Sequence, residues 1–582
     1  MSVALDDESG TIRKKWTGRL PVALLYPNVY SIAISNLGYQ LVYDALNAQE
    51  DLVCERFVYP QAQSPFRSLE SSHRLRDFPL VLASVSFEQD YPRLAAMLLV
   101  GEVPPLAQDR AKNIAAGMPL VLIGGVAMFM NPEPLAPFAD LVAVGEVEAI
   151  LPHLLPLLRT CDGIEREELL KQATFLPGCY APTFYSFSYG QSGEVLDIQR
   201  EEGLPPRIVK VIAPSMPKAG HSVLYSPQAE LDMHMVELGR GCSRACRFCA
   251  AGFIYRPPRL WPHEKVEKAM AARPTAVDRV GLLGMEMVPD LSITELAESL
   301  SVSGCMLSFS SLRADRLSPQ LLSVLGKSSL KSAAIAADGA SERLRKIINK
   351  GISGEDLLQA AVLLANAGIY HLKVYVMIGL PGETMADICE LAELIREMQA
   401  LLLPLGRKRG RVMELTLSVN CFVPKPWTPF QYCSFGGDYV PLEVINKKKH
   451  LKAVQKGLRA KFQHLRELLS GQSNIRYSFS APESALEQAV YARADRRIAP
   501  VLLKRGSGAM SFKQAMELHG LDPWDFAVRR REQHELFCWE IIDHGIKASY
   551  LWQEYERSLK GVPTPPCQPE QCRLCGVCHG EI

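Results

Sequence analysis

Three cysteines within eight residues have the spacing of metal ligands. In the segment ELGRGCSRACRFCAAGF, Cys242, Cys246 and Cys249 follow the pattern C-x3-C-x2-C. Three thiolates on one loop can bind three irons of a four-iron cluster, whereas a plain iron–sulfur site uses four cysteines. The fourth iron then stays open, and it can chelate the amino and carboxylate groups of S-adenosylmethionine (SAM). A structural zinc site is the alternative, but His234 and His263, the nearest further ligands, lack zinc spacing.

A second group of cysteines lies in the last sixteen residues. Cys567, Cys572, Cys575 and Cys578 follow C-x4-C-x2-C-x2-C. Four thiolates satisfy either a tetrahedral zinc ion or an auxiliary iron–sulfur cluster, and free thiols are a third reading. The remaining eight cysteines have no metal spacing and are expected to be buried small side chains.

The first triad directly follows one strand in a series of alternating strands and helices. Strands are predicted at 233–239, 277–285, 305–312, 332–338, 372–379 and 412–423. Six strand–helix units are too few for a closed eight-fold barrel and predict an open, partial (β/α)6 barrel, whose chemistry lies at the carboxyl ends of its strands.

The N-terminal part has its own alternating pattern. Apolar runs at 22–27, 52–58, 79–87, 119–125 and 140–146, separated by segments of helix length, predict an α/β doubly wound domain of the Rossmann or flavodoxin type. Ligands of such domains bind at the carboxyl ends of the strands. Gly124, Gly125, Gly145 and Glu146 are therefore candidate cofactor contacts, and ordinary tight turns are the alternative.

The chain is predicted to comprise four regions. They are a doubly wound domain (1–160), a linker (161–230), the partial barrel (231–440) and a mainly helical region ending in the four-cysteine motif (441–582). The formal net charge of +1 gives no reason to propose a nucleic-acid or membrane-surface protein. No apolar run is long enough to span a bilayer, and the charged start is unlike a signal peptide, so we expect a cytoplasmic protein without a membrane partner.

A strand followed by GCSRACRFCAAG and a partial barrel resembles the radical SAM superfamily. The resemblance extends to SFSSLRADRL, AADGASERLRKIINKGIS, LKVYVMIGLPGET and SVNCFVPKPWTPFQ. It implies a [4Fe–4S] cluster on the triad, with reductive cleavage of SAM to methionine and a 5′-deoxyadenosyl radical. The SAM contacts implied are Ser311, Arg313, Asp338, Gly379, Gly382 and Glu383. One departure is that relatives usually have Ala-Pro-Glu-Ala-Gly-Ser where this chain has 336–341.

The 22–158 region resembles the cobalamin-binding domain of one radical SAM subgroup, including the segment GGVAMFMNPEPLAPFADLVAVGEVEAIL. The Asp-x-His-x-x-Gly signature of methionine-synthase-like domains is absent, and His73 and His153 are the only histidines before residue 180. Cobalamin is therefore expected to bind without a histidine ligand on its lower face. A doubly wound domain that has lost its cofactor is the alternative.

The leading functional prediction is a cobalamin-dependent radical SAM enzyme, which methylates an unactivated carbon. The reductant is expected to be ferredoxin or flavodoxin, and the substrate is left open among a small molecule, a peptide and RNA. One alternative is a methylthiotransferase acting on RNA or a ribosomal protein, although the known type adds three N-terminal cysteines where this domain has only Cys54. Another is a cobalamin or redox sensor that does not cleave SAM.

Overall fold

The computed structural model describes residues 7–60, 65–213, 218–284, 305–309, 312–328, 330–437 and 446–579. Its contacts divide the chain into two compact units. Unit 1 comprises Met1–Asp232, Val490–Asp525 and His534–Gly545, and unit 2 comprises Met233–Ala489, Phe526–Gln533 and Ile546–Ile582. The C-terminal region therefore contributes to both units.

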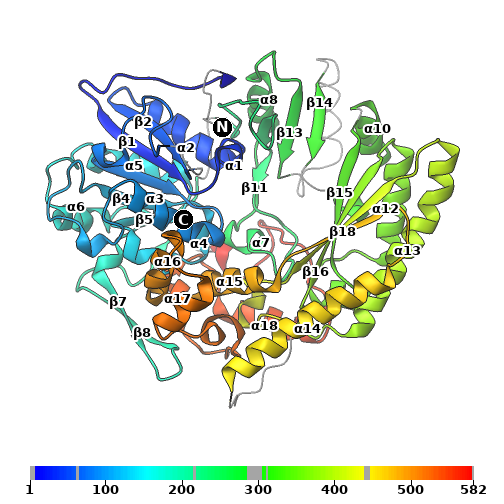
Figure 1. Ribbon diagram of the computed structural model, residues 1–582. Coiled ribbons are helices and arrows are strands. Elements are labelled where there is room, and N and C mark those ends of the chain that lie inside the picture. Colours follow the sequence, from blue (N-terminus) through cyan, green and yellow to red (C-terminus); the bar gives the residue numbers. More distant parts are fainter. Residues whose placement is uncertain are drawn as a thin grey trace. The chain divides into compact units, whose positions relative to one another are not determined.

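Unit 1 is built on a mainly parallel sheet with the strand order β2-β1-β3-β4-β5-β6, in which only β6 is antiparallel. Its strands are β1 (Leu20–Tyr26), β2 (Leu52–Val58), β3 (Leu80–Ser84), β4 (Leu120–Gly124), β5 (Leu141–Ala143) and β6 (Cys179–Tyr180). Its helices are α1 (Tyr30–Ile34), α2 (Leu37–Asn47), α3 (Tyr91–Val100), α4 (Val126–Met130), α5 (Val147–Leu158), α6 (Arg166–Ala173), α16 (Ala499–Gly506) and α17 (Phe512–Leu518). The predicted doubly wound fold, with all five of its strands, is confirmed (Figure 1).

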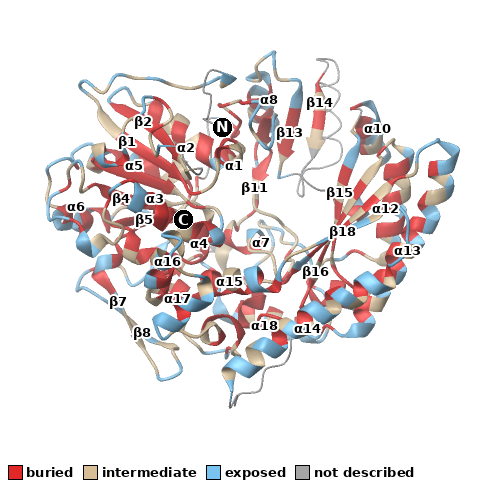
Figure 2. Ribbon diagram, in the orientation of Figure 1, coloured by how far each residue is buried: buried red, intermediate tan, exposed pale blue. Residues whose placement is uncertain are grey.

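The rest of unit 1 consists of short strand pairs. β7 (Tyr185–Tyr189) and β8 (Val195–Arg200) form an antiparallel pair, and β9 (Ile208–Val209) pairs with β19 (Ile542–Asp543). The central strands are buried along nearly their whole length because helices cover both faces of the sheet, and Figure 2 shows them largely in red.

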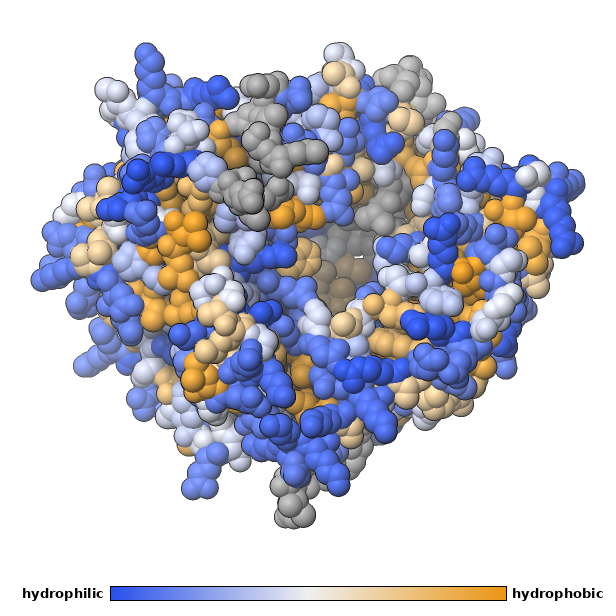
Figure 3. Space-filling model, viewed as in Figure 1, coloured by the Kyte–Doolittle hydropathy of each residue, from blue (hydrophilic) through white to orange (hydrophobic). Residues whose placement is uncertain are grey.

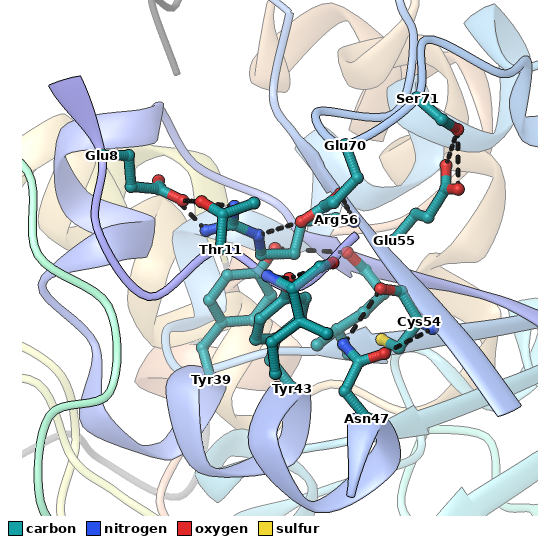
Figure 4. A network of polar contacts seen from close by, with 12 residues as sticks. Glu8, Thr11, Tyr39, Tyr43, Asn47, Cys54, Glu55, Arg56, Glu70 and Ser71 are labelled. Atoms are coloured by element: carbon teal, nitrogen blue, oxygen red, sulfur yellow. Dashed lines mark hydrogen bonds and ion pairs between the residues drawn. The ribbon is translucent and has the colours of Figure 1, made fainter. Parts of the chain in front are cut away.

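A buried ionic cluster holds the described start of the chain on this sheet (Figure 4). The guanidinium of Arg56, on β2, is 1% exposed and lies 2.5 Å from carboxylate oxygens of both Glu8 and Glu70. It also lies 4.7 Å from the centre of the Tyr43 ring on α2. Because two carboxylates face one buried guanidinium, the opposite charges compensate one another, and none of these three charges is buried without a partner.

The described residues of unit 2 form seven parallel strands in two sheets, ordered β10-β13-β14 and β15-β16-β17-β18. A parallel bridge from Leu312 to Ile335 joins the chain after β14 to β15. The strands are β10 (His234–Glu237), β13 (Arg279–Leu283), β14 (Met306–Phe309), β15 (Ser332–Gly339), β16 (His371–Ile378), β17 (Glu414–Cys421) and β18 (Ile475–Phe479). This is the predicted open barrel, with β18 as an unpredicted seventh strand.

The helices of unit 2 alternate with these strands. They are α7 (Ala251–Ile254), α8 (His263–Ala271), α10 (Pro319–Lys327), α11 (Glu342–Ile347), α12 (Gly354–Asn366), α13 (Met385–Lys408), α14 (Lys447–Leu468) and α18 (Ala548–Leu559), while α15 (Pro482–Arg493) crosses the boundary between units. A two-stranded pair, β11 (Gly239–Arg240) and β12 (Arg259–Leu260), flanks the cysteine loop. The loop thus begins where the first barrel strand ends.

In the described residues, no helix has both the length and the apolar character needed to cross a membrane. Much of the face seen in Figure 3 is hydrophilic.

Candidate functional site

The predicted cluster ligands lie on the loop between β11 and α7. The loop is a tight turn, in which the Cys249 N–H donates to the Cys246 carbonyl at 3.0 Å and the Arg244 N–H donates to the Cys242 sulfur at 3.4 Å. Burial raises the pKa of the Cys246 thiol to about 12 and also raises that of Cys249. These buried thiols therefore need a strongly bound cation to become thiolates, which is what iron supplies.

Within the described ranges, no three His, Cys, Asp or Glu side chains converge as ligands of one metal ion. A four-iron cluster does not need such convergence, because each of its cysteines binds a different iron. The donor set and the burial of the triad therefore fit the cluster.

A buried arginine fixes the triad loop in place. The Arg247 side chain is 0% exposed, and its guanidinium lies 3.1 Å from the Glu554 carboxylate. It donates to the carbonyls of Ile347 at 2.9 Å and Val562 at 2.6 Å. The Arg247 backbone N–H donates to the Ile348 carbonyl. Because Arg247 lies between two of the predicted ligands, these bonds hold both against the rest of unit 2.

Two of the predicted SAM contacts lie close to the triad. Asp338 ends β15 in a left-handed conformation (φ 58°), at a bulge in the pairing with β16. Its carboxylate accepts a hydrogen bond from the Lys350 ammonium at 2.6 Å, and both groups lie within electrostatic range of the Cys246 thiol. Arg313 donates to the Lys350 carbonyl at 2.8 Å. A non-glycine residue held in this conformation is typical of a functional site.

Lys350 was missed by the sequence reasoning. It lies within the stretch 336–353 that carries the family resemblance, but a single lysine has no spacing that marks it. The structure makes it a positive charge beside the buried Cys246 thiol, and the charge of Lys350 opposes the rise in the Cys246 pKa. Ser311 lies outside the described residues.

The Gly379–Glu383 loop follows β16, the strand next to β15. The Glu383 carboxylate accepts hydrogen bonds from the Gly379 N–H at 2.9 Å and is paired with Lys461 at 3.0 Å, so it closes its own loop. Burial raises the pKa of Glu383. Its second oxygen, Oε2, is buried and has no hydrogen-bond partner in the described part of the chain. Gly379 and Gly382 both have positive φ; Gly379 is buried, and a Cβ atom on it would lie 2.8 Å from Leu458, whereas the backbone of Gly382 is exposed.

In unit 1, the predicted glycines are explained largely by packing. A Cβ atom on Gly125 (φ 101°) would lie 2.4 Å from the Val85 carbonyl oxygen, and one on Gly145 (φ 146°) would lie 2.3 Å from that of Val211. Glu146 is buried, and its carboxylate accepts a hydrogen bond from the Ala213 N–H at 2.8 Å. A Cβ on Gly124 would meet only ordinary contacts. Three of these four residues thus have roles in the protein's own structure.

A group of polar side chains lies at the carboxyl ends of β1 and β3. In sheets of order 2-1-3-4-5, ligands bind at this switch point. The Asn28 amide donates to the Asp90 carboxylate at 3.0 Å, and the Asn36 amide lies 3.4 Å from the Ser86 hydroxyl. Burial raises the pKa of Asp90 to about 6, and its Oδ2 is buried with no hydrogen-bond partner among the residues described. The sequence analysis singled out Gly124, Gly125, Gly145 and Glu146 rather than these residues.

The four tail cysteines come together at the end of unit 2. The electrostatic environment of Cys567 includes the thiols of Cys572, Cys575 and Cys578. Cys575 is buried at 4% exposure, and the other three are half-buried.

Two family models match the chain. The model of the radical SAM superfamily matches residues 236–395, and that of the N-terminal region of radical SAM proteins matches residues 38–182. Together with the triad loop on an open parallel barrel, these matches define a radical SAM enzyme, and the chain belongs to that superfamily.

A curated relative and several solved structures, TsrM and OxsB among them, resemble the chain. The uncharacterized protein MJ0966 of Methanocaldococcus jannaschii is 26% identical over 490 residues, covering 83% of this chain and 90% of the relative. The radical SAM methyltransferase TsrM of Kitasatospora setae, solved with tryptophan substrate and a SAM analogue, matches with TM-score 0.50 and 12% identity, covering 86% of this chain and 98% of TsrM. The cobalamin-dependent enzyme OxsB matches with TM-score 0.48 and 14% identity, covering 93% and 80%. The likeness to TsrM is a likeness of the fold alone.

Proposed function

We propose that this enzyme binds cobalamin in unit 1 and SAM in unit 2, and that it methylates an unactivated carbon of its substrate. The observation that carries the cobalamin assignment is the group of polar side chains at the β1 and β3 ends, where Asp90 has a buried oxygen without a hydrogen-bond partner among the described residues. TsrM, whose fold resembles that of this chain, is a radical SAM methyltransferase that has also been solved with cobalamin and a [4Fe–4S] cluster bound. This supports assigning cobalamin and methyl transfer to the present chain.

Different residues of unit 2 bind the cluster and SAM. Cys242, Cys246 and Cys249 hold three irons, and Lys350 places a positive charge beside them. Asp338 and the exposed backbone at Gly382 lie near the ends of adjacent strands, where they can receive the nucleoside of SAM. When bound, the cluster and SAM supply a 5′-deoxyadenosyl radical, and the protein supplies the donor set and a buried position.

The residues of unit 1 hold the second cofactor. Asn28, Asn36, Ser86 and Asp90 offer amide, hydroxyl and carboxyl groups for the polar side chains of cobalamin, and none of them is a histidine. When bound, cobalamin supplies a carrier for the methyl group. The single electron needed for each SAM cleavage is assigned to a donor of the ferredoxin or flavodoxin class.

A bulky substitution within this polar group tests the cobalamin assignment. Ser86→Trp places a large ring at the end of β3, and Gln108→Trp, an exposed position near the opposite end of this sheet, is the matched control. After loading with hydroxocobalamin and desalting, wild type and Gln108→Trp are expected to retain cobalamin and, with SAM and reductant, to form S-adenosylhomocysteine. Ser86→Trp is expected to keep its iron and lose cobalamin. Wild-type protein that keeps no cobalamin contradicts the proposal.

A further inference from the structure

The C-terminal cysteine motif is bonded directly to the triad loop. The backbone N–H of Cys567 donates to the carbonyl of Ser243, the neighbour of Cys242, at 2.6 Å. From bond lengths, the Cα atoms of Cys242 and Cys567 are at most about 10 Å apart. The motif therefore lies beside the radical SAM cluster.

Side chains strengthen this junction. The Asn349 amide donates to the carbonyls of Ala245 at 3.2 Å and Thr564 at 3.0 Å, and its oxygen accepts the Thr564 N–H at 2.9 Å. Asn349 has a positive φ of 55°, so this bridging position is held in a sparsely populated conformation. Arg247 adds its bond to the Val562 carbonyl. The segment leading into the tail is thus held against the triad loop by three independent residues.

The spacing of the tail favours an iron–sulfur cluster over zinc. Structural zinc sites usually combine two short ligand pairs separated by a longer stretch of chain. Here all four cysteines fall within twelve residues, and the last three have the C-x2-C-x2-C spacing of bacterial ferredoxins. This spacing fits a cubane, which binds each cysteine through a different iron.

The charge around the tail suits an anionic cluster. The guanidinium of Arg256 lies beside the Cys575 thiol and is within electrostatic range of Cys567 and Cys578. Arg256 is held in place by its bond to the Gly252 carbonyl at 2.8 Å and by the Phe253 ring, 4.5 Å away. The Cys575 carbonyl accepts the Lys547 N–H, which ties the tail to the start of α18. A fixed cation beside four thiolates offsets part of their charge.

We propose that Cys567, Cys572, Cys575 and Cys578 bind a second [4Fe–4S] cluster, which passes electrons to the cluster on the triad. In this step a low-potential one-electron donor reduces the tail cluster from the 2+ to the 1+ state. The electron then moves to the triad cluster, which changes from 2+ to 1+ as the tail cluster returns to 2+. No bond is made or broken.

Metal content tests the site independently of cobalamin and of turnover. The full chain is purified anaerobically as wild type, as Cys242→Ala/Cys246→Ala/Cys249→Ala, and as Cys572→Ala/Cys575→Ala, with Cys389→Ala as a control outside both groups. We expect about eight irons per chain in wild type and in Cys389→Ala, and about four, with matching sulfide, in each multiple variant. The triad-less variant is decisive because its tail is intact. Zinc without iron in that variant, or no metal, overturns the proposal.

Magnetic resonance tests the proximity. Reduced wild-type protein is expected to give an electron paramagnetic resonance spectrum broadened by coupling between two neighbouring clusters. Each multiple variant is expected to give the unbroadened spectrum of one cluster. A wild-type spectrum equal to the sum of the two variant spectra contradicts a direct electron path.

Discussion

Arg247→Ala is expected to release the triad loop and destabilise unit 2. The side chain is fully buried, pairs with Glu554, and donates to carbonyls on two other segments. Removing one partner of a buried ion pair costs about 3 to 5 kcal/mol, because the other charge stays buried. At about 2 °C per kcal/mol for a unit of this size, the midpoint of heat unfolding should fall by about 6 to 10 °C.

The assay is calorimetry of metal-free protein, so that cluster binding does not contribute to the midpoint. Lys327→Ala, an exposed residue at the end of α10, is the control and should stay within about 0.5 kcal/mol of wild type. Arg247→Ala/Glu554→Ala should lose less than the sum of the two single variants, since neither member of the buried pair is then left without the other, and Arg557, the second cation beside Glu554, is partly exposed. The reasoning would be refuted if the unfolding midpoint of Arg247→Ala fell by less than about 2 °C, or if the loss in the double variant equalled the sum of the losses in the two single variants.

Three further predictions follow from the same contacts. Lys350→Met removes the positive charge beside Cys246 and should lower the reduction potential of the triad cluster, measured by spectroscopic titration; an unchanged potential would contradict this. Burial lowers the pKa of His544 to about 3, so the free energy of unfolding of unit 1 should fall by about 1.4 kcal/mol per pH unit as the pH drops below about 6.5. In unfolding curves measured at several pH values, His544→Gln should show a weaker dependence on pH than wild type. Equal slopes for the two proteins would contradict this. Glu70→Ala leaves Arg56 with a single carboxylate and should lower the free energy of unfolding by about 3 kcal/mol, measured by denaturant unfolding. A loss under about 1 kcal/mol would show that the buried ionic cluster around Arg56 is not stabilising.

The sequence sufficed where the signal was local. The loop that carries the cysteine triad and the buried apolar strands of the parallel sheets were predictable, because residue spacing and continuous apolar runs can be recognised without tertiary information. β18 was missed because three of its five residues are exposed, so it is defined by pairing with β17 rather than by an apolar run.

The rest needed the fold. Gly125, Gly145 and Glu146 were predicted as ligand contacts, but the structure gives them backbone packing and hydrogen bonds to segments distant in sequence. Conversely, neither Lys350 nor Asn349 belongs to a motif. The fold brings Lys350 close to the triad, and it makes Asn349 a bridge between the triad loop and the tail. Such roles depend on long-range contacts, which residue spacing does not encode.

SAM cleavage is the most direct test of the central assignment, that the triad loop holds a radical SAM cluster. Protein reconstituted anaerobically with iron and sulfide is reduced with dithionite in the presence of SAM, and 5′-deoxyadenosine is followed for wild type, Cys246→Ala and the control Cys389→Ala. We predict 5′-deoxyadenosine from wild type and Cys389→Ala, and none from Cys246→Ala. No product from wild-type protein with an intact, reduced cluster would contradict the assignment.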